Sequence, residues 1–151
     1  MRRETALKLN DFMAKWEETP DRNRQAFLRL KEYLDGKEGL ALEFIPRSGV
    51  SYSLRAFHDA QGKKALCVVV DVIEDDPRWL SVCFFADMIT DPLEKGEMIP
   101  NGLIGEDAVC FDIEKWEENY MRYIETRLDE ACRSARKCTT NHDEDGNFTA
   151  C

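Results

Sequence analysis

Two arginines and the strand residues around them form the set of side chains best suited to bind a small ligand. Arg47 lies just before, and Arg55 within, a segment in which serines alternate with larger residues. A sheet face that combines a cation with apolar walls is typical of a pocket for a small anionic or amphipathic ligand. The residues predicted to form this site are Arg47, Ser51, Ser53, Arg55, Cys67, Cys83 and Phe85. The alternative is an edge arginine that is exposed to water or paired with Glu43.

A second set of candidate residues, Cys138, His142 and Cys151, lies near the C-terminus. Thiolate and imidazole groups bind soft metal ions such as zinc, but the spacing here fits no usual structural zinc site. A flexible segment would also lose conformational entropy on closing around an ion. Metal (iron) or thiol handling through the acidic surface and these cysteines is therefore the alternative function, and no cofactor is predicted.

Nucleophilic catalysis finds little support in the sequence. It needs a thiol or hydroxyl with a base within hydrogen-bond reach. The chain has only two histidines, His58 and His142, and the sequence places neither beside a nucleophile on a rigid element. It also has neither a GxGxxG motif nor a P-loop. The sequence favours a non-catalytic binding module for a small ligand or a protein over an enzyme.

The composition restricts partners and compartment. Acidic residues outnumber basic residues by 30 to 21, which gives a net charge of −9 at pH 7. Such a chain repels phosphate backbones, so nucleic acid is not an expected partner. The longest apolar run, Ala65 to Val70, is far shorter than the ~20 residues of a membrane span. Since the N-terminus also lacks a secretion signal, we expect a cytoplasmic protein with no membrane partner and six free thiols.

Hydrophobic periodicity predicts the order of the elements. Apolar residues recur at helical spacing over residues 5–18 and again up to Asp35-Gly36. Beyond Gly39 the period becomes two, which predicts strands over 40–45, 51–57, 64–73 and 79–86. Because hairpin-length turns join these strands, the sheet should be antiparallel.

The last third of the chain predicts less regular structure. Residues 87–107 are punctuated by glycine and proline, so we expect a loop with one helical turn over 91–95 and then a short strand over 108–111. Asp112 is the predicted cap of a final helix, whose apolar stripe includes Tyr120 and either Tyr123 or Ile124. The predicted fold is a single α+β domain over residues 1–136. It has two N-terminal helices, a four- to five-stranded antiparallel sheet and a C-terminal helix packed on the sheet. A flexible acidic tail over 137–151 follows.

The central strands are apolar at every position, so both faces of the sheet need cover. One alternating set is Cys67, Val69, Cys83 and Phe85, and the other is Leu66, Val68, Val82 and Phe84. Leaving either set in water would forgo about 1.5–3 kcal/mol for each large side chain. The helices can cover one set. We expect a second copy of the chain, or a bound ligand, to cover the other.

A short segment resembles a known family. Gly49-Val50-Ser51-Tyr52, followed by Ala56-Phe57, is similar to the corresponding motif of the YdhG-like family of small domains of unknown function. Helices before the motif, a Gly62-Lys63 hairpin after it and a late strand leading into a C-terminal helix follow the order of that family. The resemblance implies a compact α+β fold with an antiparallel sheet. Some members are labelled putative iron chaperones, but the resemblance implies no catalytic residues.

Overall fold

The computed structural model describes residues 1–60 and 63–140 of the chain. Helices and strands follow the order α1 (Arg3–Lys15), α2 (Asn23–Asp35), β1 (Leu40–Arg47), β2 (Ser51–Ala60), β3 (Lys63–Ile73), β4 (Trp79–Phe85), the short 3₁₀ helix η1 (Ala86–Met88), β5 (Glu97–Leu103), β6 (Glu106–Ile113) and α3 (Glu118–Thr140). None of the helices in this described part is long and apolar enough to cross a membrane.

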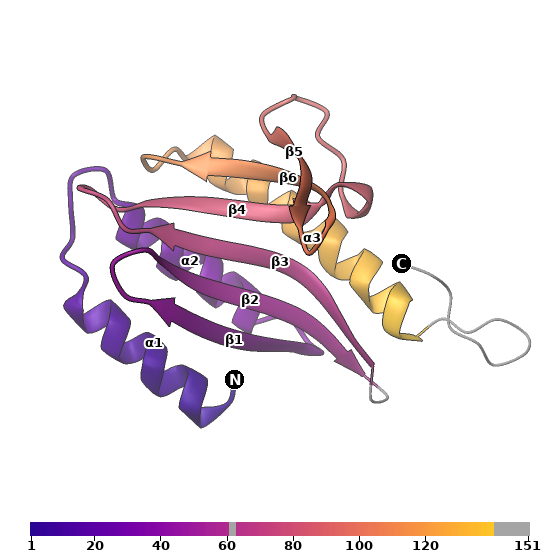
Figure 1. Cartoon of the computed structure of the whole chain (residues 1–151), viewed down its shortest axis with the longest axis horizontal. Helices are drawn as coiled ribbons and strands as arrows, with labels where there is room; N and C mark the ends of the chain where they lie inside the picture. The colour runs from indigo at the N-terminus through magenta and orange to yellow at the C-terminus, as the bar shows by residue number, and fades with distance from the viewer. Residues whose placement is uncertain (61–62, 141–151) are drawn as a thin grey trace, which may run out of the picture.

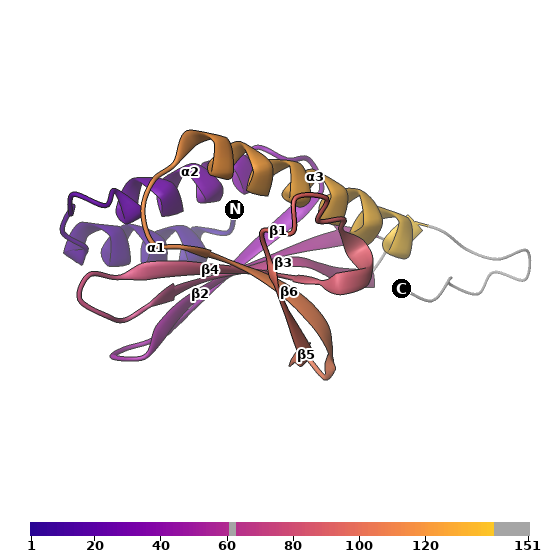
Figure 2. The same ribbon diagram turned by 90° about the horizontal axis from the view of Figure 1, so that it is seen from above.

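The strands form one antiparallel sheet in the order β1-β2-β3-β4-β6-β5 (Figure 1). Figure 2 shows α1, α2 and α3 on the same side of this sheet. We call the other side the helix-free face. The predicted fold class, with two N-terminal helices and a C-terminal helix on an antiparallel sheet, is confirmed, and the sheet has six strands rather than four or five.

The additional strand is β5, which lies in the segment predicted to be a loop. It pairs with β6 from Glu97 to Ile99, and the register is irregular between Ile99 and Leu103. Pro100 and Gly102 stand in this irregular part. Proline lacks the N–H group that a central strand must donate, but an edge strand tolerates it. The glycine and proline residues therefore mark an edge strand here. Before this strand, the segment predicted to be a helical turn forms a single turn, in which the Glu94 N–H donates to the Asp91 carbonyl oxygen.

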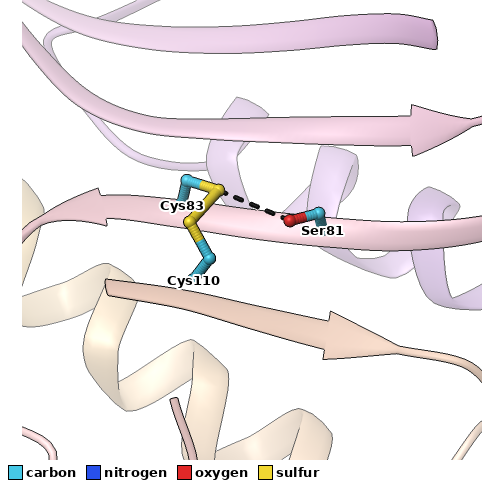
Figure 3. The surroundings of a disulfide bond; sticks show 3 residues. All are labelled: Ser81, Cys83 and Cys110. Atoms are coloured by element: carbon cyan, nitrogen blue, oxygen red, sulfur yellow. Dashed lines mark hydrogen bonds between the residues drawn. A yellow bond between two sulfur atoms is a disulfide. The ribbon is translucent and has the colours of Figure 1, made fainter. Parts of the chain in front are cut away.

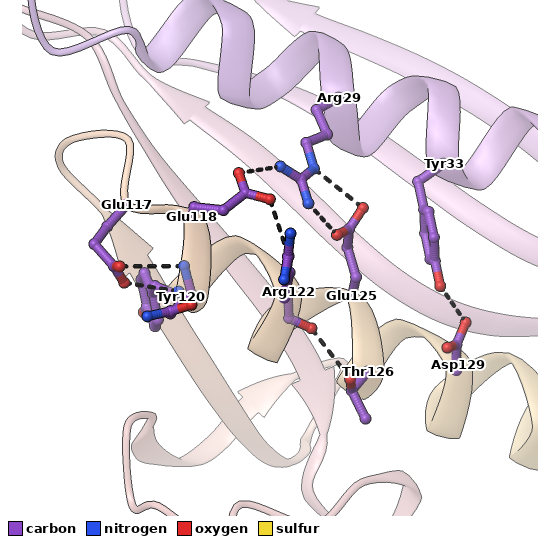
Figure 4. Close-up of polar contacts among 10 residues, drawn as sticks. Arg29, Tyr33, Glu117, Glu118, Tyr120, Arg122, Glu125, Thr126 and Asp129 are labelled. Atoms are coloured by element: carbon purple, nitrogen blue, oxygen red, sulfur yellow. Dashed lines mark hydrogen bonds and ion pairs between the residues drawn. The ribbon is translucent and has the colours of Figure 1, made fainter.

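Helix α3 differs from its predicted bounds at both ends. Asp112 belongs to β6, and the cap is Glu117, whose carboxylate accepts the backbone N–H groups of Asn119 and Tyr120 (Figure 4). At the other end, the predicted domain boundary after residue 136 falls inside α3, where Cys138 is buried. The rest of the predicted tail, residues 141–151, lies outside the described residues.

The hydrophobic core lies between the helices and one face of the sheet. Near α1, the Phe12 ring packs on Phe27 and Tyr52, at centroid distances of 5.9 Å and 4.5 Å. Under α3, Phe84 and Phe111 from neighbouring strands make an edge-to-face contact at 5.8 Å. Side chains from three helices and five strands thus bury one face of the sheet across β1, β2, β3, β4 and β6.

Ion pairs fix α3 beside α2 (Figure 4). The Arg29 guanidinium donates to Glu118 at 2.7 Å and to Glu125 at 2.6 Å, and Asp129 accepts from Tyr33 at 2.7 Å. These charge-assisted bonds raise the pKa of Arg29, with the Glu125 bond as the largest cause. They set the position of α3, which contributes side chains to both cavities described below.

Candidate functional site

The strand register places almost all of the predicted ligand-binding residues on the helix-free face. One row across the sheet contains Ser53, Asp71, Ser81 and Asp112 at paired positions, and the next contains Arg55, Val69, Cys83 and Cys110. Side chains of alternate residues share a face. The predicted residues on the helix-free face are therefore Arg47, Ser51, Ser53, Arg55, Cys83 and Phe85.

Cys67 is the exception, and its predicted position on that face is wrong. Ala56 pairs with Val68, but Phe57 pairs with Leu66, so Cys67 is the extra residue of a β-bulge. A bulge shifts the alternation by one residue. Cys67 therefore belongs to the buried core under the helices, and the alternation places Leu66 on the helix-free face. The sequence carries no turn residue at this position that would have signalled the bulge.

Arg55, one of the two arginines of the predicted site, has partners close to it in the sheet. Arg55 Nε donates to Ser53 Oγ at 3.4 Å. Glu43 lies opposite Arg55 in the register, but its carboxylate pairs with Lys64 at 2.5 Å. The Lys64 ammonium also lies 4.1 Å from the centroid of the Phe57 ring. Long side chains thus cover part of the helix-free face, which explains why several apolar residues there are only half-exposed.

Cys83 is joined to Cys110 by a disulfide bond between β4 and β6 (Figure 3). The two residues occupy directly paired positions, and their Cα atoms are 4.2 Å apart. The prediction of six free thiols is therefore wrong at these two positions, and it is also wrong at Cys138, which is disulfide-bonded as well. The separation of 27 residues between Cys83 and Cys110 gave no sign that the strands would bring them together. Cys67 and Cys132 are free thiols.

A cavity of about 990 Å³ lies where the end of β6, the first turns of α3 and the segment before β5 meet. It is lined by aromatic, acidic and basic side chains: Leu93, Lys95, Asp112, Glu114, Lys115, Glu117, Asn119, Tyr120 and Tyr123. We call it the α3–β6 cavity. Its volume is at the upper end of the range of about 300–1,000 Å³ that is typical of small-molecule sites.

The walls of the α3–β6 cavity are fixed by hydrogen bonds. Tyr120 donates its hydroxyl to the backbone oxygen of Asp112 at 3.0 Å. The Tyr123 hydroxyl donates to the Asp91 carboxylate and accepts the backbone N–H of Leu93. Asp91 also accepts the backbone N–H of Gly96 at 2.9 Å. The loop that forms one wall is therefore fastened to α3.

The packing of this wall requires a glycine. A Cβ atom on Gly96 would lie 2.4 Å from Val109 Cγ1 and 3.0 Å from the Phe111 ring. Neighbours this close would have to move, because the core around them is close-packed. Gly96 thus lets the loop approach β6 closely enough to complete the cavity.

The electrostatic environment of the cavity is unfavourable for additional negative charge. Burial, together with the charges of Glu97 and Glu114, raises the pKa of Asp112 above its ordinary value. Burial and the neighbouring Asp112 raise the pKa of Tyr120 to about 12, so its hydroxyl stays protonated at neutral pH. Burial opposes the ionised form of Asp91, but the hydrogen bonds from Tyr123 and two backbone N–H groups outweigh it and lower the pKa of Asp91.

Sequence reasoning missed this cavity because it considered Tyr120 and Tyr123 only as candidates for the apolar stripe of α3. Both side chains are half-buried, with their hydroxyls hydrogen-bonded at the rim of the core. Tyrosine behaves in this way at boundaries, because one end of the side chain is apolar and the other is polar. The sequence feature that could have indicated this cavity was the pair of tyrosines one helical turn apart.

Within the described residues, no group of three or more histidine, cysteine, aspartate or glutamate side chains is arranged to hold a metal ion. Of the predicted metal ligands, Cys138 is a buried residue of α3. His142 and Cys151 lie outside the described residues, so that set stays a prediction.

Comparisons of the chain with protein-family models, with curated proteins and with solved structures find no match. The resemblance to the YdhG-like family therefore stays a prediction.

Proposed function

We propose that this protein is a binding module that holds a small, positively charged amphipathic ligand in the α3–β6 cavity. The observation that carries the proposal is the combination of two tyrosine rings with a cluster of carboxylates around one cavity of suitable volume. A ligand with an apolar ring and an amine would match both parts of this lining. The net charge of −9 supports a protein that does not bind nucleic acid.

The sign of the ligand charge follows from the lining. Asp112, Glu114 and Glu117 contribute three carboxylates, against the ammonium groups of Lys95 and Lys115. Burial, together with repulsion from Glu97 and Glu114, disfavours the ionised form of Asp112 and so raises its pKa. A bound cation would relieve this repulsion, and tyrosine faces attract cations as well. The anionic ligand expected at the arginines of the helix-free face would be repelled here.

Two probes of similar shape and opposite charge test this proposal. We expect tryptamine to shift the backbone amide NMR signals of Leu93, Tyr120 and Tyr123, and we expect indolepropionate to leave them unchanged. The affinity for tryptamine should fall as the pH is lowered through the pKa of Asp112, because protonation removes the attracting charge. Equal shifts with both probes, or no shift with either, would contradict the proposal.

A charge variant provides the matched control. Replacing Asp112 by Asn together with Glu114 by Gln should weaken tryptamine binding by about three- to tenfold, since each partly exposed charge contributes up to about 1 kcal/mol. Glu32→Gln removes one exposed carboxylate on α2 that does not line the cavity, and it should leave the affinity unchanged. A loss of the same size in both variants would show a general charge effect instead of a site.

A second copy of the chain across the helix-free face is the partner that we propose. Ile73, Trp79 and Phe85 are only half-buried there, and none of the three helices lies on that side. Burying them against a symmetric copy would remove this apolar surface from water. Light scattering should then give about twice the chain mass of 17.5 kDa. A single species at the monomer mass, up to high protein concentration, would exclude the dimer.

A further inference from the structure

A second cavity, of about 390 Å³, lies beside the end of α3 on the helix-covered side of the sheet. We call it the Cys132 cavity. It is lined by Lys37, Glu38, Leu40, His58, Asp129, Cys132, Arg133 and Arg136. It shares no lining residue with the α3–β6 cavity, so it requires a separate explanation.

The β-bulge in β3 brings a second thiol to this cavity. It turns Cys67 into the core cluster against which Cys132 packs, and each of the two side chains shifts the pKa of the other. Cys67 is 1% exposed, and Cys132 is partly exposed at the cavity. One thiol is therefore open to small molecules, and the other lies directly behind it.

The environment distinguishes the two thiols chemically. The neighbouring Cys67 side chain lowers the pKa of Cys132 against the opposing effect of burial, and the charge of Lys37 lowers it further. The neighbouring Cys132 side chain and burial raise the pKa of Cys67. A thiolate is the attacking form in thiol–disulfide exchange, so Cys132 is the better nucleophile of the pair.

The charges around the cavity favour an anionic reaction partner. Lys37, Arg133 and Arg136 outnumber the carboxylates of Glu38 and Asp129. Asp129 holds Lys37 in place at 2.6 Å. A positive cavity on a protein of net charge −9 is a local feature, and it would concentrate small molecules that carry carboxylates.

We propose that Cys132 and Cys67 form a dithiol that reduces small carboxylate-bearing disulfides bound in the Cys132 cavity. The Cys132 thiolate attacks one sulfur of the disulfide, forms a mixed disulfide and releases the first thiolate. The Cys67 thiol then loses its proton to that released thiolate and attacks Cys132. The products are a Cys67–Cys132 disulfide and two small thiols, so two cysteines are oxidised while one small disulfide is reduced. This activity goes beyond the proposed ligand binding.

Two disulfides of similar size and opposite charge test the proposal on the full-length protein. We expect dithiodipropionate to react about tenfold faster than cystamine, because steering by local charge changes encounter rates by at least this factor. Peptide mapping by mass spectrometry should find Cys67 joined to Cys132 in the product. A mixed disulfide that persists on Cys132 in the unaltered protein, with Cys67 still reduced, would overturn the proposal.

Variants separate the two thiols and the charge. Cys67→Ser should trap the mixed disulfide on Cys132, and Cys132→Ser should abolish the reaction at Cys67. Arg133→Gln should reduce the preference for dithiodipropionate by about threefold, and Arg122→Gln, on the same helix away from the cavity, should not change it. Equal rates for the two disulfides in the unaltered protein would disprove the charge selection. Because this measurement needs no variant, it stands even if Cys67→Ser is too unstable to isolate.

Discussion

Replacing Phe84 by Ala is expected to lower the free energy of unfolding by about 3–5 kcal/mol. Phe84 is fully buried on the helix-covered side of β4, and its ring packs edge-to-face on Phe111. Truncation would remove both the buried apolar surface and this aromatic contact, and the close-packed core would close the cavity only in part. Thermal unfolding should show a decrease in Tm of about 10 °C for a chain of this size.

The neighbouring residue provides the control. Phe85 has the same side chain on the next position of the strand, but it lies on the helix-free face and is half-buried. Phe85→Ala should cost only about 1 kcal/mol if this face is open to water in solution. Equal losses in both variants at every protein concentration would show that the assignment of the two faces is wrong. A loss for Phe85→Ala that grows with protein concentration would instead support the symmetric dimer.

Removal of the Cys83–Cys110 disulfide by the double substitution Cys83→Ala and Cys110→Ala is expected to cost about 3.5 kcal/mol. The bond closes a loop of 27 residues that contains η1, β5 and the loop of the α3–β6 cavity. A cross-link of this span restricts the unfolded chain and raises its free energy by about that amount. The measurement is the free energy of unfolding from denaturant titration, without reductant.

A reductant gives an internal control for this prediction. Dithiothreitol should destabilise the unaltered protein to nearly the same extent as the double substitution, and it should have little further effect on the double variant. Mass spectrometry after alkylation would show which cysteines were reduced. If the reductant destabilised the double variant as much as the unaltered protein, the stabilisation would come from another cysteine pair.

The predictions from sequence succeeded where a local pattern was enough. A helical period followed along the chain by a period of two predicts helices and then strands, because each pattern buries one side of its own element. The alternation along β4 therefore correctly placed Phe84 and Phe85 on opposite faces of the sheet, and Phe84 is the one in the core. Hairpin-length turns were likewise enough to make the sheet antiparallel.

Sequence reasoning failed wherever contacts between distant segments decided the outcome. β5 exists because β6 offers it an edge to pair with, although its own sequence reads as a loop. Cys83 and Cys110 are bonded only because β4 and β6 are neighbours in the sheet. Both features depend on strand order, which the turns along the chain do not specify.

Both candidate sites also depend on contacts between segments that are distant in the sequence. The amino-acid sequence by itself determined the elements, the excess of acidic residues and the presence of thiols and tyrosines. Only the tertiary structure decided that one extra residue in β3 turns Cys67 toward Cys132, and that α3 sets Tyr120 and Tyr123 above the end of β6. The physical reason is that a one-residue bulge reverses which face a strand residue occupies, and the free energy that decides it comes from packing against α3.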